Sequence, residues 1–115
     1  MPVLVTPEII GSTAVIHLKG EIDSSNLSEM ELVIKPLLAD PALQTFLLHC
    51  KELVFIDSKV VGFLAYLSTT LAKSKRPLVM AALNETVNDI LSLVGLNQII
   101  PHYPTLEDAL LLKTA

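Results

Sequence analysis

The chain has 115 residues, of which 51% are hydrophobic, and a formal net charge of −4 from 8 basic and 12 acidic side chains. This length suits one domain with a single core. A mildly acidic chain with no Trp is a poor candidate for direct nucleic-acid binding, which needs basic patches and aromatic stacking surfaces. No apolar run reaches the roughly 18 residues of a membrane span, so no membrane insertion is expected.

Two further features favour a cytoplasmic location. Residues 1–6 contain no basic segment followed by a long apolar run, so no secretion signal is predicted. Cys50 is the only cysteine, which excludes an internal disulfide and fits a reducing compartment. We therefore expect one soluble domain over residues 1–115.

The first part of the chain predicts a hairpin and a helix. Residues 3–10 and 13–19 have strand-like composition, and Pro7 places the first of these strands at an edge of the sheet. Turn and N-cap residues fill positions 20–26, and apolar side chains at helical spacing then predict a helix over 27–38. An exposed first strand allows pairing between chains, so a homodimer is one expected assembly.

Strands and helices alternate through the rest of the chain, which predicts parallel pairing through right-handed crossovers. The expected fold is α/β, a single domain with a mixed sheet of four to five strands and helices packed mainly on one face. The predicted elements are, in order, a central strand at 44–50 that resumes at 53–56, a helix at 58–73, a strand at 78–83, a helix at 85–94, a strand at 97–100 and a helix at 106–112.

The junction at Asp57 and Ser58, where the central strand leads into a helix, is the most informative stretch. Either residue is a good N-cap, and capping alone would explain both residue types. A serine here would also lie beside free backbone N–H groups and the positive end of the helix dipole, which favour an added phosphate. The helix carries more apolar residues than one buried stripe needs, including Val61, Phe63 and Tyr66, so it is either sandwiched in the core or exposes a partner surface.

Catalytic chemistry has little support. His17, His49 and His102 lack metal-ligand spacing, and no G-x-S-x-G elbow surrounds Ser58 to support a Ser-His-Asp triad. None of the four glycines belongs to a phosphate-cradling loop. We therefore expect a protein that is not an enzyme and needs no cofactor or metal. A small nucleotide-binding or hydrolysing protein is a third interpretation, tested by nucleotide titration.

Three segments taken together resemble the STAS domain, and within that family the bacterial anti-sigma factor antagonists. They are Lys-Gly-Glu-Ile-Asp at 19–23, Phe-Ile-Asp-Ser at 55–58 with a glycine at position 62, and Val-Gly-Leu-Asn-Gln-Ile-Ile at 94–100 followed by the segment 105–110. The resemblance runs from about residue 12 to the end of the chain.

The resemblance implies a partner switch that regulates transcription. In the antagonists, an anti-sigma factor that is itself a serine kinase phosphorylates the serine after the aspartate, which is Ser58 here. The unphosphorylated form binds the kinase and frees a sigma factor, and a serine phosphatase restores that form. The expected partner contacts are Asp23, Ser24, Asn26, Asp57, Lys59, Gly62, Phe63 and Tyr66.

The chain also departs from the family pattern. The family usually has Asp-Ser-Ser/Thr-Gly, whereas this chain has Lys59 and Val60 after its Asp-Ser pair. A β-branched residue thus enters the first helical turn, and a cation stands beside the acceptor. His49 stands where the family tends to have Asp or Asn. The alternative function is an unphosphorylated STAS scaffold, or a subunit of a regulatory or transporter complex.

Overall fold

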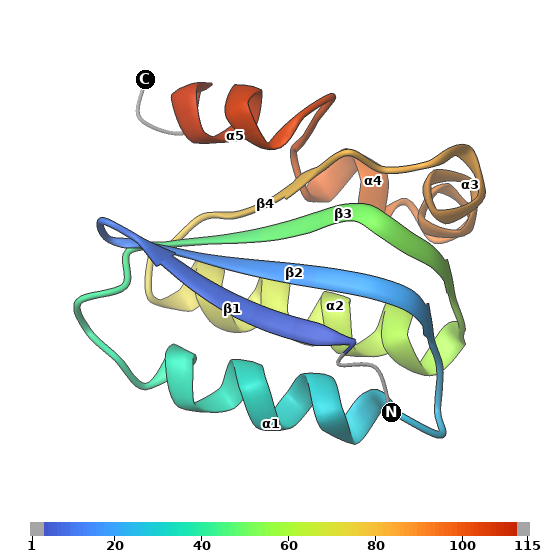
Figure 1. Cartoon of the computed structure of the whole chain (residues 1–115), viewed down its shortest axis with the longest axis horizontal. Coiled ribbons are helices and arrows are strands. Elements are labelled where there is room, and N and C mark those ends of the chain that lie inside the picture. Colours follow the sequence, from blue (N-terminus) through green and yellow to red (C-terminus); the bar gives the residue numbers. More distant parts are fainter. Residues whose placement is uncertain (1–3, 113–115) are drawn as a thin grey trace.

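A computed structural model describes residues 4–112, and its five strands form one mixed sheet in the order β1-β2-β3-β4-β5 (Figure 1). β1 and β2 form an antiparallel hairpin, and the other neighbours pair in parallel. The strands are β1 (Val5–Ile10), β2 (Thr13–Ile22), β3 (Thr45–Ile56), β4 (Leu78–Ala81) and β5 (His102–Tyr103). The predicted α/β class and the upper strand number are confirmed. The predicted first strand begins at Val3, which lies outside the described residues.

Most helices cover one face of the sheet, as predicted, and one covers the other. A large apolar cluster joins the sheet to α1 (Leu27–Leu38), α2 (Ser58–Lys73), α3 (Glu85–Leu93) and α4 (Leu96–Ile99). A second, smaller cluster on the opposite face packs under α5 (Leu106–Leu112). Figure 1 shows α5 and the pair α1 and α2 on opposite sides of the sheet. The sheet is therefore a central layer with apolar residues on both faces.

The predicted strand at 97–100 is wrong. The chain forms the short helix α4 there, and the last strand is β5, which pairs with Met80 and Ala81. Leu96 and Ile100 are both buried while Ile99 is 63% exposed, and that spacing of four is helical. An apolar run this short does not distinguish strand from helix by composition alone.

Other boundaries also differ from prediction, among them the end of β4, which stops at Ala81 and not at residue 83. β2 continues past Gly20, and β3 runs unbroken through its polar middle, because pairing between these two strands supplies the backbone hydrogen bonds. The helix α3 ends at Leu93, one residue earlier than predicted, and Val94 is 59% exposed. Gly95 has a φ of 77°, a left-handed conformation that glycine adopts at little cost, and this separates α3 from α4.

β2 and β3 are parallel, so the segments that follow them lie at the same edge of the sheet. The loop before α1 follows β2, and the start of α2 follows β3. This is the edge at which open parallel sheets commonly carry their functional residues.

The Asn84 side chain links α3 to β3 through hydrogen bonds. Its Oδ1 accepts a hydrogen bond from the backbone N–H of Val87 at 2.7 Å, and its Nδ2 donates to the carbonyl of Leu53 at 2.8 Å. We expect Asn84→Ala to lower the free energy of unfolding by about 1–2 kcal/mol, because the helix cap and the bond to β3 are both lost. Urea denaturation measures this change. Asn84→Asp retains the capping acceptor and should lose less, so an equal loss in the two variants would contradict the capping role.

Candidate functional site

Asp57 begins the helix α2. Its backbone is extended, with φ −102° and ψ −177°, and its Oδ1 accepts a hydrogen bond from the backbone N–H of Val60 at 3.1 Å. This is the N-cap arrangement, in which a side-chain oxygen satisfies one of the N–H groups that the first helical turn leaves free. The structure therefore assigns the cap to Asp57 and makes Ser58 the first residue of the helix.

The other carboxylate oxygen of Asp57 holds the loop between β2 and α1. Oδ2 accepts a hydrogen bond from the backbone N–H of Ser24 at 2.8 Å, across 33 positions of sequence. One side chain thus joins two segments that the sequence analysis assigned to the same surface. The carboxylate sets the distance between the loop and the start of α2.

Asp23 and Asn26 shape the loop itself. Asn26 Oδ1 accepts from the backbone N–H of Asp23 at 2.8 Å, and Asn26 Nδ2 donates to the carbonyl of Glu21 at 3.0 Å. Asp23 Oδ1 accepts from the N–H of Ser25 at 2.9 Å and from its hydroxyl at 2.5 Å. Both side chains therefore stabilise the turn.

The hydrogen bonds around Asp57 also determine its charge. Desolvation acts to raise the pKa of the Asp57 carboxyl, but hydrogen bonds from the backbone N–H groups of Val60, Ser24 and Lys59 and from the Ser24 side chain outweigh it and lower the pKa. A carboxylate that accepts several N–H bonds is favoured in its charged form. Asp57 is therefore ionised at neutral pH and carries a negative charge next to Ser58.

Ser58 is exposed, and its hydroxyl makes no hydrogen bond to any residue that the structure describes. It stands at the N-terminus of a 16-residue helix, where the helix dipole is positive. A free hydroxyl in this position can be reached by a second protein without any rearrangement of the fold.

The two residues that depart from the family pattern point in opposite directions. Lys59 is exposed, so its cation stands at the surface beside Ser58. Val60 is 1% exposed and packs in the main core. The β-branched side chain in the first helical turn therefore contributes to the core and does not cover the surface next to Ser58.

Fewer of the predicted partner contacts on α2 are exposed than the sequence indicated. Gly62 is exposed, and Tyr66 is 50% exposed. Phe63, predicted to contact a partner, is only 7% exposed and stacks on Tyr66 with ring centroids 5.9 Å apart. The buried stripe of α2 thus includes Phe63 beside Val60 and Leu64.

Two apolar residues beside the site were not predicted. Val54 and Phe55 lie at the end of β3, just before Asp57, and are 54% and 40% exposed. β4 pairs with β3 only as far as His49, so this part of β3 extends beyond its neighbour. The signal in the sequence was the unbroken apolar run before Asp57, but a buried strand gives the same pattern.

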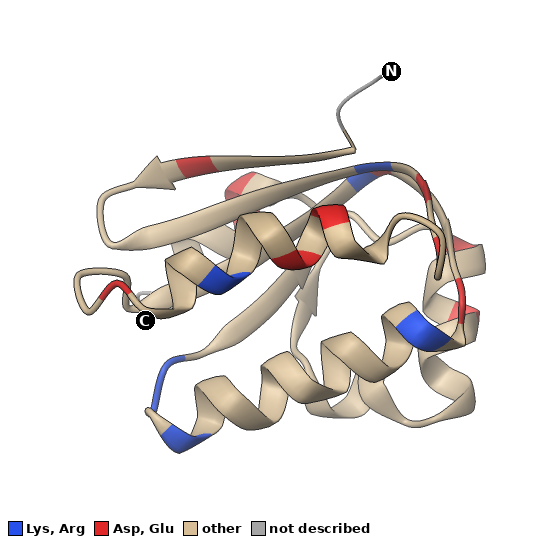
Figure 2. Ribbon diagram, turned by 90° about the horizontal axis from the view of Figure 1, so that it is seen from below, with Lys and Arg blue, Asp and Glu red and all other residues tan. Residues whose placement is uncertain are grey.

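The main basic cluster lies away from Ser58. Lys73, Lys75 and Arg76 follow one another at the C-terminal end of α2 and in the segment leading to β4, where Figure 2 shows blue residues. The Arg76 guanidinium donates to the carbonyls of Leu38 and Leu43, and lies 5.4 Å from the ring centroid of Phe46. Arg76 therefore joins the ends of α1 and α2 to the sheet.

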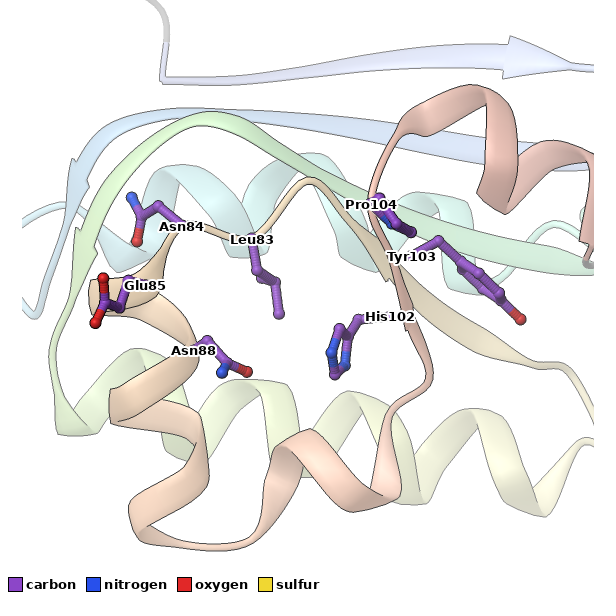
Figure 3. A pocket seen from close by; sticks show the side chains of 7 residues that line it. All are labelled: Leu83, Asn84, Glu85, Asn88, His102, Tyr103 and Pro104. Atoms are coloured by element: carbon purple, nitrogen blue, oxygen red, sulfur yellow. The ribbon is translucent and has the colours of Figure 1, made fainter.

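A pocket of about 490 Å³ lies between α3 and β5 (Figure 3). None of the predicted site residues lines it, and the Asn84 side chain in its wall is already bonded to α3 and β3. Its lining consists of Leu83, Asn84, Glu85, Asn88, His102, Tyr103 and Pro104.

The histidines do not assemble into a catalytic or metal site with Ser58. His17 and His49 bond to each other on the α5 face of the sheet, and His102 is exposed on β5. Within residues 4–112 there is no cluster of three His, Cys, Asp or Glu side chains that could hold a metal ion. No helix in the same range is long and apolar enough to cross a membrane.

The sheet order and the capped helix define a class of small α/β domain, and comparison with protein families identifies it. The model of the STAS domain matches residues 5–109. The chain therefore belongs to the STAS domain family. A search of curated protein sequences gave no match.

Solved structures share this fold. An anti-sigma factor antagonist from Mycobacterium paratuberculosis is 25% identical, with a TM-score of 0.84 over 96% of this chain and 93% of that one. Unphosphorylated SpoIIAA, an anti-sigma factor antagonist from Bacillus, is 20% identical, with a TM-score of 0.81 over 96% and 97%. The murine anion transporter Slc26a9 is also 20% identical, with a TM-score of 0.79 over 93% of this chain but 18% of the transporter.

Gly62 has no evident role in the fold. A Cβ built at this position meets no atom within 4 Å, and glycine inside a helix costs about 0.5–1 kcal/mol relative to alanine. We expect Gly62→Ala to raise the free energy of unfolding by about that amount, measured by urea denaturation. Ala72→Gly, at an exposed position of the same helix, should lower it by a similar amount. A destabilised Gly62→Ala would show that the fold itself needs this glycine.

Proposed function

We propose that this chain is an anti-sigma factor antagonist that is not itself an enzyme. In this proposal, it binds an anti-sigma factor through the surface around Ser58 and is controlled by phosphorylation of Ser58. The observation that carries the proposal is the free, exposed hydroxyl of Ser58 at the start of a helix capped by Asp57. Similarity to the mycobacterial antagonist and to SpoIIAA supports it.

The local charges allow a phosphate at Ser58 without loss of the fold. A phosphoserine carries about −1.5 to −2 charge, which the helix dipole and the exposed Lys59 favour and the carboxylate of Asp57 opposes. Asp57 keeps its two backbone bonds through its own oxygens, which Ser58 does not share. SpoIIAA is known in both phosphorylated and unphosphorylated forms.

The neighbouring surface explains how the phosphate would act on binding. Val54, Phe55 and Tyr66 expose apolar area close in sequence to Ser58, and polar loop residues such as Ser24 border it. A partner that covers this apolar area would have to strip water from a phosphate dianion, and an interface that buries an unpaired charge is strongly weakened. Phosphorylation by the kinase would therefore release the partner, and a serine phosphatase would restore binding.

The similarity to Slc26a9 favours a second candidate function. That transporter contains a region with the same fold, although this chain spans only 18% of its length. A STAS scaffold, or a subunit of a regulatory or transporter complex, would use the same surface for permanent binding. In that case, the charge at Ser58 would have little effect on the partner.

Phosphorylation can be tested directly. We expect incubation with the cognate anti-sigma kinase and ATP to place one phosphate on Ser58, identified by phosphopeptide mass spectrometry. Ser58→Ala should abolish the signal, and Ser92→Ala, which removes an exposed serine on α3, should not change it. Absence of phosphate on Ser58, with the kinase active on another substrate, would refute the switch.

A charge substitution separates the switch from the scaffold. Ser58→Asp should weaken binding to the anti-sigma factor at least about tenfold if the switch operates, since it places a charge in the interface. Thr86→Asp adds the same charge to the first turn of α3 and should leave the affinity unchanged. Calorimetric titration measures both affinities, and unchanged binding of the Ser58→Asp variant would favour the scaffold.

A further inference from the structure

A row of three titratable side chains crosses the sheet on the α5 face. Glu8 on β1, His17 on β2 and His49 on β3 are connected by short contacts: Glu8 Oε1 to His17 Nε2 is 2.7 Å, and His17 Nδ1 to His49 Nδ1 is 2.9 Å. Val15 and Leu47 precede the two histidines by two residues, so they share this face, and they pack under α5. The row is separate from the Ser58 site.

The geometry fixes where the protons lie when the pair is neutral. Since the Glu8 carboxylate only accepts, His17 must carry a proton on Nε2. His17 Nδ1 is then unprotonated and accepts, and the proton in the contact between the two histidines belongs to His49 Nδ1. His49 is therefore held in its Nδ1–H tautomer, and its Nε2 is a hydrogen-bond acceptor.

One added proton reverses this arrangement. It is best placed on His17, between the Glu8 carboxylate and an imidazole that can accept. His17 then donates from both nitrogens, His49 Nδ1 accepts, and the remaining proton of neutral His49 moves to Nε2. A proton taken up at His17 thus converts Nε2 of His49 from an acceptor into a donor.

A second proton is strongly opposed. It would place two Nδ1–H donors face to face at 2.9 Å and two positive charges side by side. Burial and the charge of His17 both lower the pKa of His49. Lys51 on β3 also lowers this pKa, while Glu107 on α5 and Glu52 on β3 act to raise it. A further titratable side chain, Tyr103 on β5, packs against the apolar cluster under α5.

Since Nδ1 of His49 bonds to His17, Nε2 is the His49 nitrogen that remains available to the adjacent pocket. A pocket of about 310 Å³ lies between β3 and the start of α5, and its polar lining includes His49, Lys51, Thr105 and Glu107. Glu107 is in the first turn of α5, and its charge acts on His49. The Nε2–H form of His49 would therefore have a carboxylate acceptor on α5 within the same pocket.

We propose that Glu8, His17 and His49 form a proton-operated switch on the α5 face. Uptake of one proton changes His49 from an acceptor to a donor in this pocket and adds a bond from β3 to Glu107 on α5. This inference is independent of phosphorylation at Ser58, because the row and the pocket share no residue with that site.

Nitrogen-15 NMR of the imidazole rings tests the switch. At pH 8, we expect His17 as the Nε2–H tautomer and His49 as the less common Nδ1–H tautomer. On acidification, the pair should take up one proton while neutral His49 changes to Nε2–H, and a second proton should bind only at lower pH. Exposed His102, which lies outside the row, serves as the spectral reference. An Nε2–H form of His49 at pH 8, or two independent titrations, would overturn the proposal.

Variants separate the proton switch from its effect on α5. His17→Gln should return His49 to the Nε2–H tautomer at pH 8, and the control His102→Gln should leave both other histidines unchanged. Glu107→Gln should preserve the tautomer change but reduce at least twofold the pH-dependent shift of the α5 backbone amides. Backbone amide spectra verify that each variant is folded. An undiminished α5 response in Glu107→Gln would refute the link to α5.

Discussion

The carboxylate of Asp57 joins two segments that are 33 residues apart, and the geometry of the candidate site depends on it. One oxygen caps α2, and the other holds the loop that leads into α1. Because a carboxylate has two oxygens with several lone pairs, a single side chain can satisfy N–H groups from both segments. The exposed hydroxyl of Ser58 is presented by a rigid element for this reason, although it makes no bond of its own to the described residues.

The two faces of the sheet carry different groups. The face covered by α1 and α2 carries the larger apolar cluster, which orients α2 and its N-terminus. The face under α5 carries a smaller apolar cluster followed, along β2 and β3, by the paired histidines. Charge at Ser58 would act on whatever binds the edge of the sheet, whereas charge at His17 would act on the attachment of a helix within the domain.

The departure from the family pattern at Val60 changes the surface beside Ser58 less than the sequence suggests, because the Val60 side chain is buried. Val60 occupies the core side of the first turn of α2, so the surface beside Ser58 is formed by Lys59 and the exposed positions further along the helix. Phe63 shows the opposite case, since a residue assigned to the surface belongs to the core. A single helical periodicity does not reveal how wide the buried stripe of α2 is, and the structure places Phe63 in that stripe beside Val60 and Leu64.

The sequence by itself determined the local elements and the identity of the key residues. Helical spacing predicted α1 and α2, the turn residues predicted a loop before α1 although β2 continues to Ile22, and Asp57 and Ser58 stood out because N-cap residues have a strong local preference. Tertiary structure alone decided which side chains meet. Asp57 reaches Ser24, and His17 reaches His49 across 32 positions, only because parallel pairing of β2 and β3 sets their register. The helix α4 in place of a strand was decided in the same way, since burial of both Leu96 and Ile100 depends on what packs around them.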